Sequence, residues 1–213
     1  GTKIMDGNLK FWHGEVLSKE AERVLERLHN HIATFYLAGG TALALHLGHR
    51  LSRDLDFFNT QSFDEEILLN GLKDIGNLSV VSKGRETLHL HISGIKTSFL
   101  AYPYPVLFPF ESFLQAQIAD PRDIACMKIS AIAGRGSKRD FVDLYVAAQR
   151  FGLAHLLELF KKKYAGIDFN LVHALKSLTY FQDAEQEPMP KMLTGISWEE
   201  ITDFFRHEAP KLI

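Results

Sequence analysis

This sequence has only one cysteine, no long apolar run and no excess of basic residues. Its one cysteine, Cys126, cannot form an internal disulfide, which indicates a reducing compartment. No apolar run approaches the ~20 residues that a membrane-spanning helix needs. Residues 1–10 lack the basic and then apolar pattern of a signal peptide. We therefore expect a cytoplasmic protein that makes no contact with a membrane.

The charge balance excludes a second class of protein. The 24 Lys and Arg residues are offset by 26 Asp and Glu residues, so the net charge is -2. A protein that coats long nucleic acids usually carries a basic excess, so any nucleic-acid contact here must be local. Hydrophobic residues make up 46% of the chain and charged residues 23%, which is typical of a globular protein of one large or two small domains.

The hydrophobic periodicity changes character halfway along the chain. The first half predicts helices at 18–32, 42–47 and 64–75 and strands at 34–38, 54–58, 78–82, 86–92 and 95–102. Three prolines between residues 102 and 111 favour an ordered connector. Helices are then expected at 121–132, 137–151, 155–164, 170–181 and 198–207. The prediction is an α+β protein, with a mixed α/β domain over residues 1–110 and an α-helical domain over 111–213.

An Asp-x-Asp sequence lies in one of the predicted strands. Residues two apart in a strand point to the same face, so Asp54 and Asp56 project together while Leu55 and Phe57 enter the core. Two carboxylates about 7 Å apart repel each other, and a divalent cation between them removes the repulsion. Mg²⁺ takes carboxylate oxygens and completes its shell with water and substrate phosphates. A solvent-facing pair without a metal is the alternative interpretation.

Two glycines separate the first predicted strand from the helix that follows it. At such a helix start the backbone N–H groups converge and the helix dipole favours anions. Gly39 and Gly40 lack Cβ atoms, so a phosphate could approach the backbone closely, and the Thr41 hydroxyl could donate to it. A plain strand-to-helix turn would need the same glycines, so the motif alone leaves both interpretations open.

Two ordered blocks of sequence resemble one known family. Residues 39–45 (GGTALAL) are followed by 48–58 (GHRLSRDLDFF), and 123–128 (DIACMK) by 135–144 (RGSKRDFVDL). Together they resemble the AbiEii/AbiGii toxin family of nucleotidyltransferases, in the DNA polymerase β-like superfamily. The resemblance implies a nucleotidyltransferase-like mixed sheet and transfer of an NMP from an NTP to an acceptor hydroxyl. Members include toxins that modify RNA, including tRNA ends, and that are encoded with an antitoxin.

The resemblance also implies roles for the matching residues of the first block. Gly39, Gly40 and Thr41 would bind the nucleotide phosphates, and Asp54 and Asp56 would hold Mg²⁺ as the cofactor. In the second block, Lys128 would contact phosphate or the incoming nucleotide. Asp140 or Asp143 would complete the downstream motif.

The residues of the second block also have structural interpretations. Lys128 shares a helix face with Ile124 and Ile132, so its stem could pack while its amine reaches the surface. The spacing of Ser137 and Asp140 fits a capping box, whereas capping does not explain Asp143.

Two arginines precede the acidic pair and are candidates for nucleotide binding. Arg50 and Arg53 could contact the nucleotide, or they could neutralise Asp54 and Asp56. A surface salt bridge worth ~0–1 kcal/mol is the structural alternative.

The sequence departs from the superfamily pattern at one position. Many polymerase β-like enzymes carry a third carboxylate on a neighbouring strand, but residues 95–100 (IKTSFL) contain no acid. Glu86 on the preceding strand, or an aspartate of the helical half, could substitute for it. Without a substitute, the chain would be an inert nucleotide-binding regulatory or interaction module. His89 and His91 alternate on one predicted strand, which fits either a solvated strand face or metal ligands.

Overall fold

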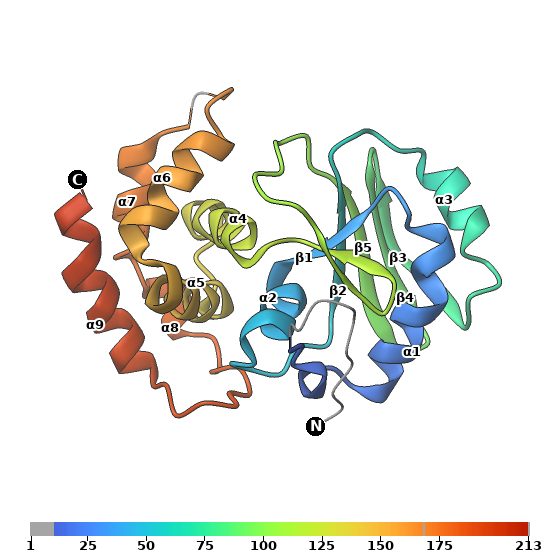
Figure 1. The fold of residues 1–213 in the computed structure, drawn as a ribbon, viewed down its shortest axis with the longest axis horizontal. Coiled ribbons are helices and arrows are strands. Elements are labelled where there is room, and N and C mark those ends of the chain that lie inside the picture. Colours follow the sequence, from blue (N-terminus) through green and yellow to red (C-terminus); the bar gives the residue numbers. More distant parts are fainter. Residues whose placement is uncertain (1–10, 168, 213) are drawn as a thin grey trace. The chain divides into compact units, whose positions relative to one another are not determined.

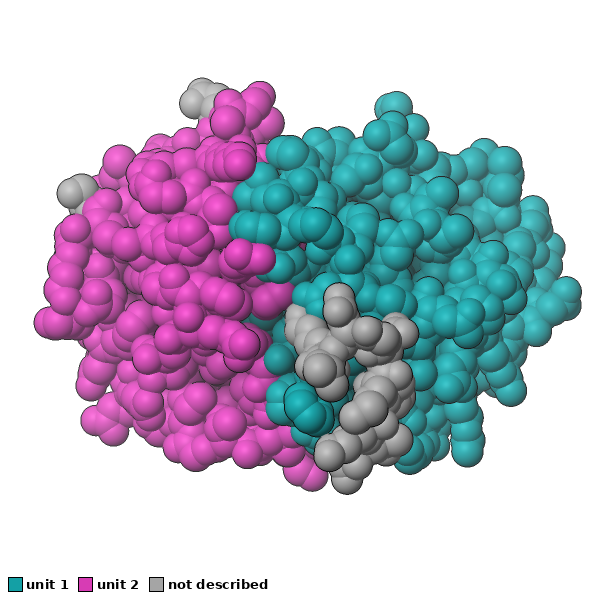
Figure 2. All heavy atoms as spheres, viewed as in Figure 1, with its two compact units in different colours: residues 1–46, 52–120 teal, residues 47–51, 121–213 magenta. Residues whose placement is uncertain are grey.

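A computed structural model describes residues 11–167 and 169–212. The chain forms two compact units. Unit 1 comprises residues 1–46 and 52–120, and unit 2 comprises residues 47–51 and 121–213 (Figure 2). The division after residue 120 lies ten residues beyond the boundary that the sequence pattern predicts. The short segment 47–51 belongs to unit 2, although the chain on both sides of it belongs to unit 1.

Unit 1 is built on a mixed sheet whose seven strands, within the described residues, have the order β3-β4-β5-β2-β1-β7-β6 (Figure 1). The strands are β1 (Tyr36–Ala38), β2 (Leu55–Asn59), β3 (Leu78–Gly84), β4 (Thr87–Ile92), β5 (Ile95–Ala101), β6 (Glu111–Phe113) and β7 (Ala116–Ile118). β2 runs parallel to β5 and β1 runs parallel to β7, while the other neighbours are antiparallel. The α+β prediction is confirmed.

The helices of unit 1 are α1 (Lys19–Leu28), α2 (Gly39–Leu47, whose last residue falls in unit 2) and α3 (Glu65–Gly71), with short 3₁₀ turns at Gly14–Val16 and His29–His31. Ser18 caps α1 as its sequence predicts, because its Oγ accepts a hydrogen bond of 3.1 Å from the N–H of Ala21. The apolar stripe of α1 is buried, and the helix packs against β5. Each fully buried leucine of such a stripe contributes roughly 1.5–3 kcal/mol.

The central strands have one apolar face and one partly exposed face. The apolar face is formed by alternate buried residues, among which Phe57 of β2 and Phe99 of β5 stack with ring centroids 5.3 Å apart. We call the opposite face the aspartate face. It carries Asp54, Asp56 and Phe58 from β2 and the residue before it, Lys96, Ser98 and Leu100 from β5, and Thr87, His89 and His91 from β4.

The last two strands of unit 1 are not predicted by the sequence. β6 and β7 have three residues each, which is too short for a recognisable alternation. Leu114 and Gln115 between them adopt φ values of +48° and +65°, a conformation that usually requires Gly or Asn. Neither the strands nor their turn therefore carries the usual sequence signal, and the α/β unit extends past residue 110.

The described residues of unit 2 are helical or in loops, apart from one β-bridge between Arg50 and Met192. Its helices are α4 (Pro121–Gly134), α5 (Lys138–Phe151), α6 (Leu153–Lys163), α7 (Leu171–Ser177), α8 (Gln182–Glu185) and α9 (Trp198–Glu208), with a 3₁₀ turn at Ala209–Leu212. α4 packs against α5, α6 and α7. None of the helices in the described part of the chain combines the length and the apolarity needed to cross a membrane.

The start of α5 differs from the predicted capping box. Ser137 makes no side-chain cap; instead its Oγ donates to Asp140 Oδ2 at 2.5 Å. The first N–H of the helix, that of Lys138, donates to Glu187 Oε2 at 3.0 Å. A carboxylate from a distant part of unit 2 therefore replaces the local cap, and Asp140 is left to take part in other contacts.

A buried ion pair joins α4 to α6. Lys163 Nζ lies 2.8 Å from Asp123 Oδ1, and both side chains are almost completely buried. The run Lys161–Lys163 resembles a solvated basic helix end in sequence, but its third lysine points into the core. Neutralisation by Asp123 is what makes this burial tolerable.

Removing the Lys163 charge is expected to destabilise unit 2. The Lys163→Met variant leaves Asp123 buried without its cation, which costs about 3–5 kcal/mol of unfolding free energy. Lys161→Met is the matched control, because Lys161 pairs with Glu158 on the surface, where such pairs contribute ~0–1 kcal/mol. Urea unfolding followed by circular dichroism measures both; equal effects of the two variants would contradict the assignment.

Candidate active site

The acidic pair lies on one face of β2, as the alternation predicts. Asp54 and Asp56 are partly exposed, whereas Leu55 and Phe57 are fully buried. Phe58 follows on the same face. Both carboxylates are therefore fixed by the pleat of a central strand, with about 7 Å between their α-carbons.

The glycine turn lies directly against the second carboxylate. Ala38 at the end of β1 is the register partner of Asp56, so the next residue, Gly39, begins α2 beside it. Gly39 has φ +67°, and a Cβ added there would lie 3.1 Å from Asp56 Oδ2. Glycine is thus needed twice, for the positive φ and for the close approach. The first turn of α2 and the Asp56 carboxylate form one local cluster.

Thr41 fastens the acidic strand to α2. Its side chain is buried, and its Oγ1 donates to the Asp54 carbonyl oxygen and lies 2.7 Å from Ser52 Oγ. The hydroxyl that the sequence assigns to a phosphate is used inside the protein in this structure. It holds the start of β2 at a fixed position relative to the Gly39–Gly40 turn.

Arg53 and Asp54 line a hollow of about 480 Å³ in unit 1. Lys96, at the start of β5, and Glu20, in the first turn of α1, belong to the same lining. The side chains of Arg53 and Lys96 are exposed. Lys96 is not among the predicted site residues, although its alternation with Ser98 on β5 places both side chains on the face that carries Asp56.

The acidic pair fits Mg²⁺ bound together with a substrate, but not a cage made of protein ligands. Within residues 11–167 and 169–212, no group of three or more His, Cys, Asp or Glu side chains is arranged to hold a metal. Mg²⁺ characteristically binds through one or two carboxylates and takes its remaining ligands from water and substrate phosphates. Asp54 and Asp56 are the two carboxylates of this face that could hold such an ion.

The other predicted site residues meet in unit 2, around one buried carboxylate. Asp143 is fully buried, and Oδ1 accepts from Arg50 Nε at 2.7 Å and from His49 Nε2 at 2.8 Å. Its Oδ2 accepts from Arg50 Nη2 at 2.9 Å and from Lys128 Nζ at 2.7 Å. Burial alone would raise the pKa of Asp143, but the charges of Lys128 and Arg50 and the hydrogen bonds hold it well below its usual range.

Asp140 extends this network. Its Oδ1 accepts from Lys128 Nζ at 2.8 Å, and its Oδ2 accepts from Ser137 and from the largely exposed Arg135. Burial opposes ionisation of both partners, yet the Lys128 charge lowers the pKa of Asp140, and the two aspartates raise the pKa of Lys128. Lys128 is therefore a buried cation between two carboxylates, and its amine does not extend to the surface.

The contact of Arg50 with Asp143 joins residues 93 positions apart in the sequence. From the sequence, Arg50 is predicted to contact the nucleotide or to neutralise Asp54 and Asp56, and His49 is not predicted to take part. The segment that carries both residues is also bonded through its backbone to a distant loop, since Leu51 N donates to Lys191 O and Leu193 N to His49 O, each at 2.9 Å. No local pattern reveals a pairing over this separation.

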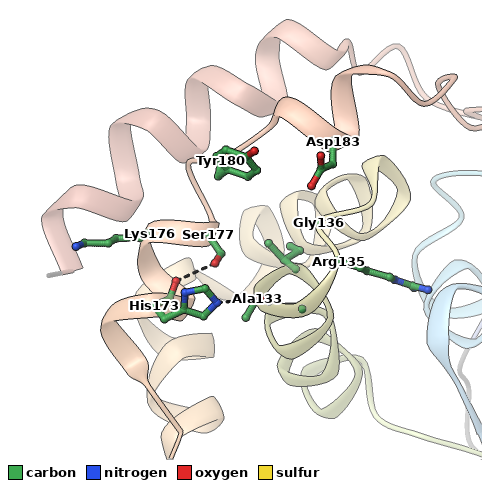
Figure 3. A pocket seen from close by; sticks show the side chains of 10 residues that line it. Ala133, Arg135, Gly136, His173, Lys176, Ser177, Tyr180 and Asp183 are labelled. Atoms are coloured by element: carbon green, nitrogen blue, oxygen red, sulfur yellow. Dashed lines mark hydrogen bonds between the residues drawn. The ribbon is translucent and has the colours of Figure 1, made fainter.

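A second hollow, of about 390 Å³, lies within unit 2 where α4 ends near α7 (Figure 3). His173 Nε2 donates to the Ala133 carbonyl at 3.0 Å, which satisfies the end of α4. The charged ends of Lys176 and Arg135 point in opposite directions in this view, so they do not converge on a ligand (Figure 3). We assign no function to this hollow.

A carboxylate pair beside a glycine turn on a mixed sheet, next to a hollow lined by both acidic and basic side chains, fits a nucleotidyltransferase type of site. The chain belongs to the family described as nucleotidyl transferase AbiEii toxin, of type IV toxin–antitoxin systems, which it matches over residues 23–211. It is thus a member of an enzyme family whose activity is nucleotidyl transfer.

Several proteins are similar to this chain over most of its length. The uncharacterized protein aq_aa25 of Aquifex aeolicus (strain VF5) is 39% identical over 205 residues, which cover 92% of this chain and 98% of that protein. Among solved structures, JHP933 from Helicobacter pylori is 18% identical with a TM-score of 0.49, covering 92% of this chain and 94% of its own. MenT4, a nucleotidyltransferase toxin from Mycobacterium tuberculosis H37Rv, is 18% identical with a TM-score of 0.48. The match covers 84% of this chain and 70% of the MenT4 chain.

Adding a methyl group at Gly39 is expected to disturb the acidic pair. Gly39→Ala places a Cβ against Asp56 and forces a side chain into positive φ, at a cost of about 1–2 kcal/mol. Gly134→Ala is the control, because its Cβ would meet no atom within 4 Å and its φ is not positive. Chemical denaturation should show Gly39→Ala destabilised and Gly134→Ala unchanged or more stable; a neutral Gly39→Ala would refute the close approach.

The Asp143 network predicts a defined loss of stability in acid. Because the folded-state pKa values of Asp140 and Asp143 are lowered, both contribute stability above the unfolded value of ~3.9 and lose it as the pH falls further. Asp143→Asn should cost about 3–5 kcal/mol at pH 7 and should flatten the decline in stability below pH ~4.

The matched control for this prediction is Asp203→Asn, since Asp203 pairs with Arg206 on the exposed surface. Urea unfolding at several pH values between 3 and 7 gives the comparison. An acid decline as steep in Asp143→Asn as in the wild type would mean that other groups cause it.

Proposed function

We propose that this protein transfers an NMP from an NTP to an acceptor hydroxyl in the presence of Mg²⁺. We further propose an RNA acceptor such as a tRNA end, action in the cytoplasm as the toxin of a toxin–antitoxin pair, and an antitoxin protein as partner. The observation that carries the proposal is the Asp54–Asp56 pair on the aspartate face, with Asp56 against the Gly39 turn. Membership of the AbiEii toxin family supports the toxin assignment.

Different residues of unit 1 would bind the metal ion and the phosphates of the nucleotide. Asp54 and Asp56 would hold Mg²⁺, which when bound neutralises phosphate charge and stabilises the transferring group. The N–H groups at Gly39 and Gly40 would donate to phosphate oxygens at the positive end of α2. Arg53, in the hollow beside Asp54, would add positive charge near the phosphates.

The reaction requires one bond to form and one to break. The acceptor oxygen attacks the α-phosphorus, and the bond from that phosphorus to the bridging oxygen breaks, releasing pyrophosphate. The proton of the acceptor hydroxyl must leave in the same step. Thr41 would contribute by fixing β2, and with it both carboxylates, so that the geometry for attack is formed before the substrate binds.

The unit 2 residues keep a role in this proposal. The family resemblance implies that Lys128 contacts phosphate or the incoming nucleotide, and this stays a prediction, because its amine is buried between Asp140 and Asp143 within unit 2. Asp140 and Asp143 would act by holding Lys128 charged and in place. Arg50 would act through Asp143, because its side chain is buried against that carboxylate.

The proposal is tested with labelled NTPs. The wild type is incubated with each NTP, Mg²⁺ and total RNA, and transfer of label to RNA is compared with that of Asp54→Asn and Asp56→Asn. Each variant should lose at least 10²-fold in rate, roughly the effect of removing a group that stabilises transition-state charge. Asp74→Asn is the control, since Asp74 is an exposed acid elsewhere in unit 1.

The other outcomes are equally informative. Transfer that survives in both aspartate variants would refute the site. Binding of NTP without any transfer by the wild type would identify the chain as an inert nucleotide-binding module of the same fold. Omission of Mg²⁺ with added chelator should abolish transfer while leaving the circular dichroism spectrum unchanged.

A further inference from the structure

Three polar side chains form a row across the aspartate face. Asp56 of β2 is the register partner of Ser98 of β5, and Ser98 is the register partner of His89 of β4. Register partners point to the same face of a sheet, with neighbouring strands about 4.8 Å apart. His89 Nδ1 lies 3.0 Å from Ser98 Oγ, so the row ends in a hydrogen-bonded Ser–His pair.

The other carboxylates considered for the third position do not reach it. Glu86 lies beside Ala101, whose N–H donates to the Glu86 carbonyl at 3.0 Å, so it is three register positions from Ser98. Asp140 and Asp143 are buried, and their oxygens accept from their own donors in unit 2. Ser98 occupies the position beside Asp56 where a third carboxylate would be expected.

We propose that Ser98 and His89 remove the proton from the acceptor hydroxyl, an inference that rests on the proposed nucleotidyl transfer. Ser98 Oγ accepts the acceptor proton and passes its own proton to His89 Nδ1, while the acceptor oxygen bonds to the α-phosphorus and pyrophosphate leaves. The hydroxyl of serine can accept and donate at once, and a neutral imidazole has one nitrogen free to accept. The result is one proton on His89 and none lost or gained overall.

The surroundings of the pair suit this role. Ser98 is almost completely buried, and its Oγ lies 3.0 Å from His89 Nδ1, so the hydroxyl can donate to the imidazole in the tautomer whose Nδ1 carries no proton. His89 is only partly buried, so a proton held there can leave to water after the reaction. In this proposal Ser98 is the catalytic residue, and His89 is a positioning residue that acts through it.

The strand also provides a matched control. His91 lies two residues beyond His89 on the same strand and face, but it is exposed and its register partner on β5 is Lys96. A histidine that serves only as a solvated surface residue should behave as His91 does. Comparing His89→Gln with His91→Gln separates the proposed role from a general effect of removing an imidazole.

The first experiment measures kcat and KM for the NTP in the RNA-labelling assay. His89→Gln and Ser98→Ala should each lower kcat by about 10²–10⁴-fold, with KM changed less than about threefold. The double variant should be no slower than either single variant, because the two residues act as one unit. His91→Gln should retain kcat within about twofold, and thermal unfolding should show all four variants folded.

The second experiment bypasses the histidine. Ser98→Asp places a carboxylate beside Asp56 that can accept the proton directly, so adding His89→Gln in this background should leave kcat unchanged. A merely structural His89–Ser98 contact predicts no such rescue. If Ser98→Asp fails to fold, the difference in kcat between His89→Gln and His91→Gln still tests the relay.

Two failures are distinguishable. An active wild type whose kcat is unaffected by His89→Gln, or is affected equally by His91→Gln, overturns the relay and leaves the proposed function intact. A wild type that transfers no label with any NTP overturns the proposed function and the relay with it.

Discussion

A carboxylate without access to water must be surrounded by donors, and Asp143 imposes this constraint on unit 2. Arg50, His49 and Lys128 supply four hydrogen bonds to its two oxygens. Lys128 in turn requires Asp140, because a buried ammonium beside one carboxylate that Arg50 already neutralises would be under-compensated. The contacts of Lys128 join α4 to α5, and those of His49 and Arg50 join residues 47–51 to α5 within unit 2.

In unit 1 the corresponding constraint is the two-residue period of the strands. Because the sheet buries one face of β2, β4 and β5, every second residue is committed to the aspartate face. The parallel pairing of β2 with β5 then determines which residue of β5 lies beside each aspartate. The strand register thus determines which side chains lie next to one another on the aspartate face. The hydrogen bond from Thr41 to the Asp54 carbonyl oxygen holds the first of these residues in place.

Local patterns were sufficient to predict most of the fold. Ser18 is a typical N-cap residue and caps α1, and the Ser93–Gly94 pair, a typical turn signal, joins β4 and β5 as an antiparallel hairpin. The β6–β7 hairpin could not be predicted, since Leu114 and Gln115 give no turn signal. For the candidate site, alternation placed Asp54 and Asp56 on one face, but the partners of Arg50 and Ser98 depend on packing and strand register between distant segments, which no local pattern contains.

The approach of Asp56 to Gly39 has a consequence for how the proposed nucleotide and cation would affect each other's binding. The first turn of α2 attracts anions, yet the nearest fixed group to it is itself an anion. A phosphate that arrives alone meets attraction and repulsion at the same place, whereas one that arrives with a cation meets attraction from both. If the proposed site binds both, the affinity for nucleotide and the affinity for cation are thermodynamically linked at this turn, and each ligand would strengthen the binding of the other by the same factor.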